Sequence, residues 1–133
     1  MSLPMLLIKI FLAAMALMFT AFGGWSLLDP LGMTSQLNVE INGPNGSFEI
    51  RGIFGGVSLG AAALCMVGAV SVRYARPALW FLVAYMGGYC FARLVSIVLN
   101  DLPTPGTWLF VGFEALSLAL AIASLIAGRR HFA

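Results

Sequence analysis

Charged side chains are scarce in this chain of 133 residues: they make up 9% of the sequence, whereas 61% of the residues are hydrophobic. A soluble domain carries roughly 25% charged residues. The deficit excludes an ordinary soluble domain and predicts a protein embedded in lipid. The net charge of +2 is too small, and the basic residues are too scattered, to indicate nucleic-acid binding.

Histidine and cysteine are also scarce. The single histidine, His131, follows the last apolar run, so no internal pair can hold haem or a transition metal. Cys65 and Cys90 do not form a C-x-x-C motif, and we interpret them as small apolar packing residues. No Ser/His or Cys/His combination suits nucleophilic catalysis, and no glycine-rich loop has the Lys and Ser/Thr of a phosphate site. We therefore expect no enzyme activity, no cofactor and no metal.

Long apolar runs dominate the chain instead. A bilayer crossing needs about 20 apolar residues, and four segments meet this length. We predict one all-α membrane domain over residues 1–133, a four-helix transmembrane bundle. Its helices are expected over about residues 4–28, 49–72, 77–99 and 107–128.

The first apolar run admits a second interpretation. Lys9 near its start and the small residues around Ala21 and Gly23 also resemble a cleavable signal peptide. The run is long for a signal core, and cleavage would leave an odd number of spans. We favour a retained helix, in which the Lys9 side chain reaches the nearer interface along its apolar stem.

The connection over residues 29–48 is the only long one. Asp29-Pro30 should end the first helix, because proline disfavours helical geometry in the residue before it. The Asn-Gly-Pro-Asn-Gly sequence of residues 42–46 is typical of turns. We predict a structured surface loop, in which the alternating pattern of residues 37–41 allows a short extended segment.

The two remaining connections and the charges predict the orientation. Residues 73–77 should form a tight basic turn, and residues 100–106 a clear break. The connections over residues 29–48 and 100–106 lie on the opposite side of the membrane from the basic turn. They carry Asp29, Glu40 and Asp101 and no basic residue. By the positive-inside rule both termini are cytoplasmic and the long loop is extracytoplasmic. The basic residues that share the cytoplasmic face are Lys9, Arg73, Arg76, Arg129 and Arg130.

Arg93 and Glu114 lie inside predicted spans, where charges are costly and usually face the bundle interior. At about 1.5 Å per residue, both lie about 10 Å below the outer boundary on consecutive helices, so we predict that they pair. Helical spacing puts Tyr89 and Asn100 on the face of Arg93. The same spacing predicts one face of the fourth helix, made of Glu114, Ser117, Ala121, Ser124 and Gly128.

Glu49 and Arg51 stand at the outer end of the second span, just above the level of Arg93 and Glu114. We therefore predict an outer-half polar cluster of these four residues with Tyr89 and Asn100. One interpretation is a buried network that fixes helix register and adds little net stability. The other is an outward-opening pocket for a lipid head group or the polar end of an apolar molecule. We favour the first, because four charges that can pair leave no group in need of a ligand.

Glycine recurs at four-residue spacing at Gly52, Gly56 and Gly60. In water each interior glycine costs a helix roughly 1 kcal/mol relative to alanine. In lipid such glycines let another helix approach closely. We predict a helix-packing face here, which serves contacts within the chain or between chains.

The stretch Glu-x-Arg-Gly-x-aromatic-Gly-Gly-x-x-x-Gly that begins at Glu49 resembles the signature of a bacterial domain-of-unknown-function family, numbered 4345. The resemblance extends to Arg93, to the Asp101-Leu-Pro103 turn and to Glu114. It implies four membrane helices in a bacterial cytoplasmic (inner) membrane and no established activity. Tyrosine is common in the family where this chain has Phe54, so this chain lacks that hydroxyl.

Three functions are compatible with these features. We favour a non-catalytic accessory or assembly subunit that packs against a larger membrane complex or against itself. The alternative is a binder of a lipid or another amphiphile at the polar cluster. Ion or proton transport has the least support, because the cytoplasmic half offers only Ser, Thr and Tyr hydroxyls. The expected partners are membrane lipid and other membrane-protein subunits or a second copy, without nucleic acid or metal.

Overall fold

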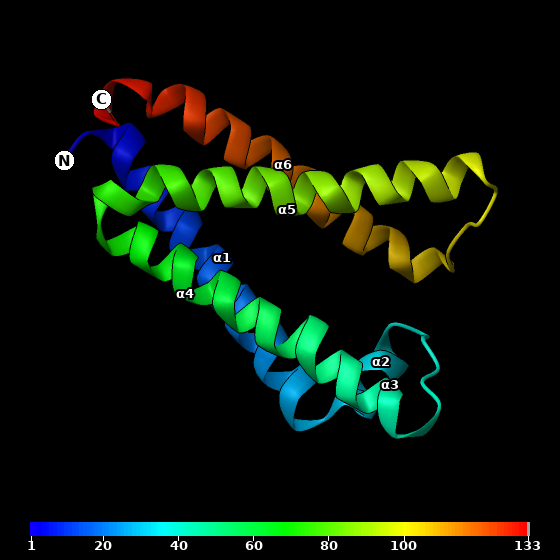
Figure 1. Ribbon diagram of the computed structural model, residues 1–133. Helices are drawn as coiled ribbons and strands as arrows, with labels where there is room; N and C mark the ends of the chain where they lie inside the picture. Colours follow the sequence, from blue (N-terminus) through cyan, green and yellow to red (C-terminus); the bar gives the residue numbers. More distant parts are fainter. Residues whose placement is uncertain (133) are drawn as a thin grey trace.

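The computed structural model describes residues 1–132, and this part of the chain is helical without a strand (Figure 1). Four helical segments are long and apolar enough to cross a membrane, as the sequence predicts. The long helices are α1 (Leu3–Leu28), α4 (Val57–Val70), α5 (Val72–Val98) and α6 (Trp108–Ala127). Helix α3 (Gly43–Ile50) and a π-helical turn (Arg51–Gly56) precede α4, so that the second span is continuous from Gly43 to Val70.

The helices pack as two pairs, α1 with α4 and α5 with α6. Helix α4 joins the pairs by packing on α5. The pairs meet at the end of the molecule that holds both termini, and they diverge toward the other end (Figure 1). The bundle is therefore packed at one end and open at the other, which decides where polar side chains can meet.

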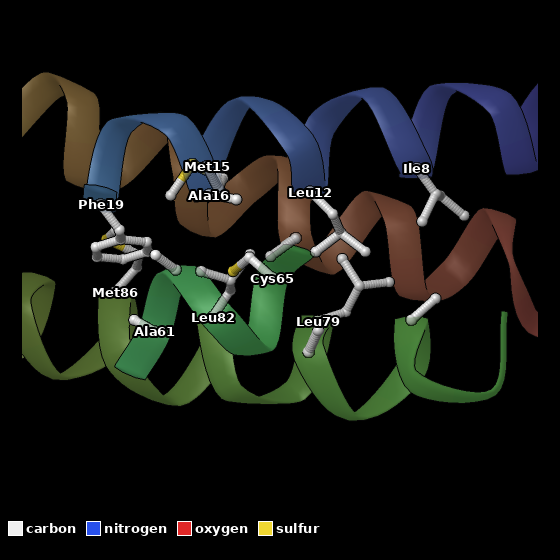
Figure 2. Packing of buried hydrophobic residues seen from close by; sticks show 14 of the residues in the cluster. Ile8, Leu12, Met15, Ala16, Phe19, Ala61, Cys65, Leu79, Leu82 and Met86 are labelled. Carbon is white, nitrogen blue, oxygen red and sulfur yellow. The ribbon is translucent and has the colours of Figure 1, made fainter. Parts of the chain in front are cut away.

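The apolar core lies at the end where the pairs meet. Leu12 of α1, Cys65 of α4 and Leu79 and Leu82 of α5 are completely buried there (Figure 2). Gly68 lets α4 approach α5, since a β-carbon added to it would lie 2.8 Å from the Ala78 Cβ. Core residues of this kind hold the pairs together at one end only.

The connection between the first two spans differs from the predicted loop. It contains helix α2 (Pro30–Gln36), and α3 begins at Gly43 rather than near residue 49. The Asp29 side chain caps α2 by accepting a hydrogen bond from the Gly32 backbone nitrogen at 2.9 Å, with Pro30 in the first turn. The Asp-Pro pair that ends one helix thus also starts the next. Residues 37–41 form no strand.

The predicted basic turn over residues 73–77 is wrong. Ser71 alone, with an extended backbone, separates α4 from α5, and Arg73 to Pro77 belong to α5. Pro77 lies in the second turn of the helix rather than the first. Its missing N–H leaves the Arg73 carbonyl without the hydrogen bond that a regular helix would give it.

Candidate functional site

Arg93 and Glu114 form a two-pronged ion pair between α5 and α6. Arg93 Nε donates to Glu114 Oε2 at 3.0 Å, and Arg93 Nη2 donates to Glu114 Oε1 at 2.8 Å. It is the one salt bridge between side chains within residues 1–132. This contact confirms the pairing that depth and charge predict.

The two helices orient the pair through their packed faces. Glu114, Ser117, Ala121 and Gly128 are buried, as the predicted face of the fourth helix requires, and Ser124 is half-buried. On α5 the Arg93 guanidinium carbon lies 5.4 Å from the centre of the Tyr89 ring, in cation–π contact. The Tyr89 ring in turn lies 5.3 Å from that of Tyr85. Glu114 is 8% exposed, so its carboxylate depends on Arg93 for compensation.

A cavity of about 220 Å³ opens beside Arg93, under the connection between α5 and α6. Its wall combines polar groups with apolar side chains. A lining of this kind suits a molecule that has a polar and an apolar part. Among the lining residues are Arg93, Ser96, Asp101, Leu102, Trp108 and Val111.

The chain reversal after α5 positions Asp101 at this cavity. Asn100 adopts a φ of 59°, in the left-handed region, and ends the helix. The Asp101 backbone nitrogen then donates to the Ser96 carbonyl at 2.8 Å. Asn100 therefore serves as a helix-terminating residue, and its exposed side chain makes no hydrogen bond in the described part of the chain. Sequence reasoning assigned the site role to Asn100 and missed Asp101.

The structure does not join Glu49 and Arg51 to the ion pair. Both residues lie at the open end of the α1–α4 pair, away from α5 and α6 (Figure 1). Arg51 Nε instead donates to the Leu27 backbone carbonyl at 3.0 Å, and Glu49 is exposed. The divergence of the two helix pairs is the physical reason, since equal depth brings groups together only in a closed bundle.

The glycines that pack inside the chain are not those with the four-residue spacing. Gly52, Gly56 and Gly60 lie on an exposed face, and an added β-carbon would meet nothing closer than 3.8 Å. A β-carbon on Gly23 would lie 2.9 Å from the Gly55 carbonyl oxygen, so these two glycines bring α1 against the second span. The second span carries two stripes of small residues, and the four-residue glycine pattern marks the exposed one.

The described residues hold no group of three or more His, Cys, Asp or Glu side chains arranged for a metal. Cys65 and Cys90 are both free thiols. Trp108, which lines the cavity, is another site residue that sequence reasoning missed. Its position at the start of an apolar helix is the signal, because tryptophan is enriched at membrane interfaces.

Four helices that are long and apolar enough to cross a membrane, two of them joined by an ion pair, define a small helical protein of the multi-pass membrane class. No curated protein and no solved structure matches the chain. A family model does match it, over residues 7–125, and its description is "Domain of unknown function (DUF4345)". The chain belongs to this family, which agrees with the resemblance seen in the sequence.

Proposed function

We propose that this protein binds a membrane amphiphile, with the polar end of that molecule in the cavity beside Arg93. The observation that carries the proposal is a cavity next to an arginine that keeps one guanidinium nitrogen outside its ion pair. Glu114 occupies Nε and Nη2 of Arg93, which leaves Nη1 without an acceptor among residues 1–132. Intramembrane ionisable residues are functional candidates by default.

The size of the cavity supports a head-group site rather than a pocket for a whole molecule. Pockets that bury a drug-sized ligand measure roughly 300–1,000 Å³. A cavity of about 220 Å³ suits a polar head, with the apolar part outside it. Val98 and Leu109, which follow the cavity-lining residues Ile97 and Trp108 in the sequence, have exposed apolar side chains.

The orientation follows from the same charges as in the sequence. Both termini and the turn between α4 and α5 lie at one end of the molecule (Figure 1). Ser2 Oγ and His131 Nε2 are 3.1 Å apart, which links the terminal segments. With five basic residues in these segments, we place this end in the cytoplasm and the cavity on the outer side of a bacterial cytoplasmic membrane.

Lipid retention in a mild detergent tests the proposal. Native mass spectrometry of the wild-type protein should show a bound phospholipid. The double variant Arg93→Met with Glu114→Met should lose it, because an apolar pair of similar size keeps the packing without the charges. Arg51→Met, which changes an arginine of the other helix pair, is the matched control and should retain the lipid. Equal retention by the double variant and the wild type would refute the proposal.

A second candidate is the accessory or assembly subunit, which packs against another membrane protein or a second copy. The exposed face of Gly52, Gly56 and Gly60 favours it, since small residues allow close approach of helices in lipid. Gly56→Leu should then release the protein from its complex while the isolated chain stays folded. Unchanged co-purification of a partner would argue against this role.

A further inference from the structure

We infer that the group bound beside Arg93 is a phosphoethanolamine head, carried by a phospholipid. The inference rests on the proposed function and names the chemistry of its ligand. Two side chains of the cavity determine that chemistry. Arg93 supplies a free donor for a phosphate, and Asp101 supplies a free acceptor for an ammonium group.

Arg93 can bind a phosphate without losing Glu114. A guanidinium group has five N–H donors, and the ion pair uses the single N–H of Nε and one of the two on Nη2. Nη1 is left to donate to a ligand. Hydrogen bonds from arginine to phosphate are charge-assisted and stronger than neutral ones.

Asp101 selects against a purely anionic head. Its carboxylate lines the cavity and forms no salt bridge in the described part of the chain. Because Glu114 already neutralises Arg93, Asp101 leaves this region with one excess negative charge. A phosphoglycerol head would add a second negative charge, whereas the ammonium of phosphoethanolamine compensates Asp101.

The order of the two residues along the chain matches the order of groups in a phospholipid. Arg93 lies within α5, and Asp101 follows the end of that helix. A lipid that enters from the membrane places its tails deepest, then its phosphate at Arg93, and its ammonium outermost at Asp101. Trp108 also lines the cavity, and tryptophan is enriched at membrane interfaces, where lipid head groups lie.

A primary ammonium fits Asp101 better than a quaternary one. A primary ammonium has three N–H donors for the carboxylate, and a trimethylammonium has none. We therefore expect the order phosphatidylethanolamine, phosphatidylcholine, phosphatidylglycerol in affinity. The apolar residues that line the cavity, such as Leu102 and Val111, and the apolar helices that carry it indicate a lipid rather than a soluble phosphoethanolamine compound.

Competition among lipids of equal chain length tests this inference on the full chain in detergent. Native mass spectrometry should show the wild type retaining phosphatidylethanolamine over phosphatidylglycerol by about tenfold, the ratio expected from one charge-assisted interaction. Asp101→Asn should bring this ratio close to unity while total phospholipid stays bound. Glu49→Gln, which removes an exposed carboxylate outside the cavity, should leave the ratio unchanged.

The possible results separate the inference from the proposed function. Bound phospholipid without head-group preference in the wild type would overturn the inference and leave lipid binding intact. An absence of any bound phospholipid would overturn both. Glycerophosphoethanolamine, which has the same polar group without tails, should not displace the lipid, and displacement at equal concentration would overturn the assignment to a lipid.

Discussion

Arg93 donates to both carboxylate oxygens of Glu114, so that α5 and α6 are joined by two charge-assisted hydrogen bonds of 3.0 and 2.8 Å. The buried partner is Glu114, whereas the Arg93 side chain is 36% exposed and faces the cavity. This asymmetry gives the two residues different roles. Glu114 fixes the guanidinium, and Arg93 presents its remaining donor to a ligand.

Glu114→Gln should destabilise the protein and weaken lipid retention together. A glutamine side chain is uncharged and has a single acceptor oxygen, so it can accept only one of the two hydrogen bonds. The positive charge of Arg93 is then no longer compensated by a carboxylate. We expect a loss of about 2 kcal/mol in the free energy of unfolding, which is in the range for hydrogen bonds to charged groups. Denaturation in a fixed detergent mixture measures it. An unchanged midpoint would contradict a stabilising role for the pair.

Gly23→Ala should destabilise the contact between α1 and the second span. Its new β-carbon would lie 2.9 Å from the Gly55 carbonyl oxygen, and backbone cannot give way as a flexible side chain can. We expect a loss of about 1–3 kcal/mol, as for other overpacked sites. Gly60→Ala is the matched control, because an added β-carbon there meets nothing within 4 Å. Equal melting temperatures of the two variants would show that this interface is not close-packed.

Arg51→Gln should cost up to about 1 kcal/mol, the net value of one hydrogen bond. The Arg51 guanidinium donates to the Leu27 carbonyl in the last turn of α1, where carbonyls lack helical partners and a positive charge is favourable. Arg76→Gln, at an exposed position on α5, should change stability less. Thermal unfolding of both variants in detergent makes the comparison, and a larger effect at Arg76 would contradict it.

Cysteine labelling tests the orientation. In a chain whose native cysteines are replaced by alanine, Gln36→Cys and Thr104→Cys should react with a membrane-impermeant maleimide in intact cells. Tyr74→Cys should react only after the cells are permeabilised. All three positions are exposed in the structure, so access to reagent depends on the side of the membrane. Labelling of Tyr74→Cys in intact cells would invert the proposed topology.

The sequence predicts the helices and the Arg93–Glu114 contact because both depend on local information. Apolar runs mark the spans, and two opposite charges at equal depth on consecutive helices have few other partners. The positions of Glu49 and Arg51 depend instead on how two helix pairs diverge. The residue pattern along a single helix does not predict the angle between two helix pairs.

The second span shows a similar limit. It has small residues on two faces, each at the three- and four-residue steps of a regular helix. The sequence pattern drew attention to Gly52, Gly56 and Gly60, whereas the structure packs Gly55 and Gly68 inside the chain. Spacing along one helix does not say which of two similar faces a neighbouring helix will cover.

A crystal structure grown from a lipidic mesophase doped with phosphatidylethanolamine tests most directly whether the cavity beside Arg93 holds a phospholipid head group. We predict phosphate density within hydrogen-bonding distance of Arg93 Nη1, with both bonds to Glu114 retained. A cavity filled only by water or by protein side chains would contradict lipid binding at this site.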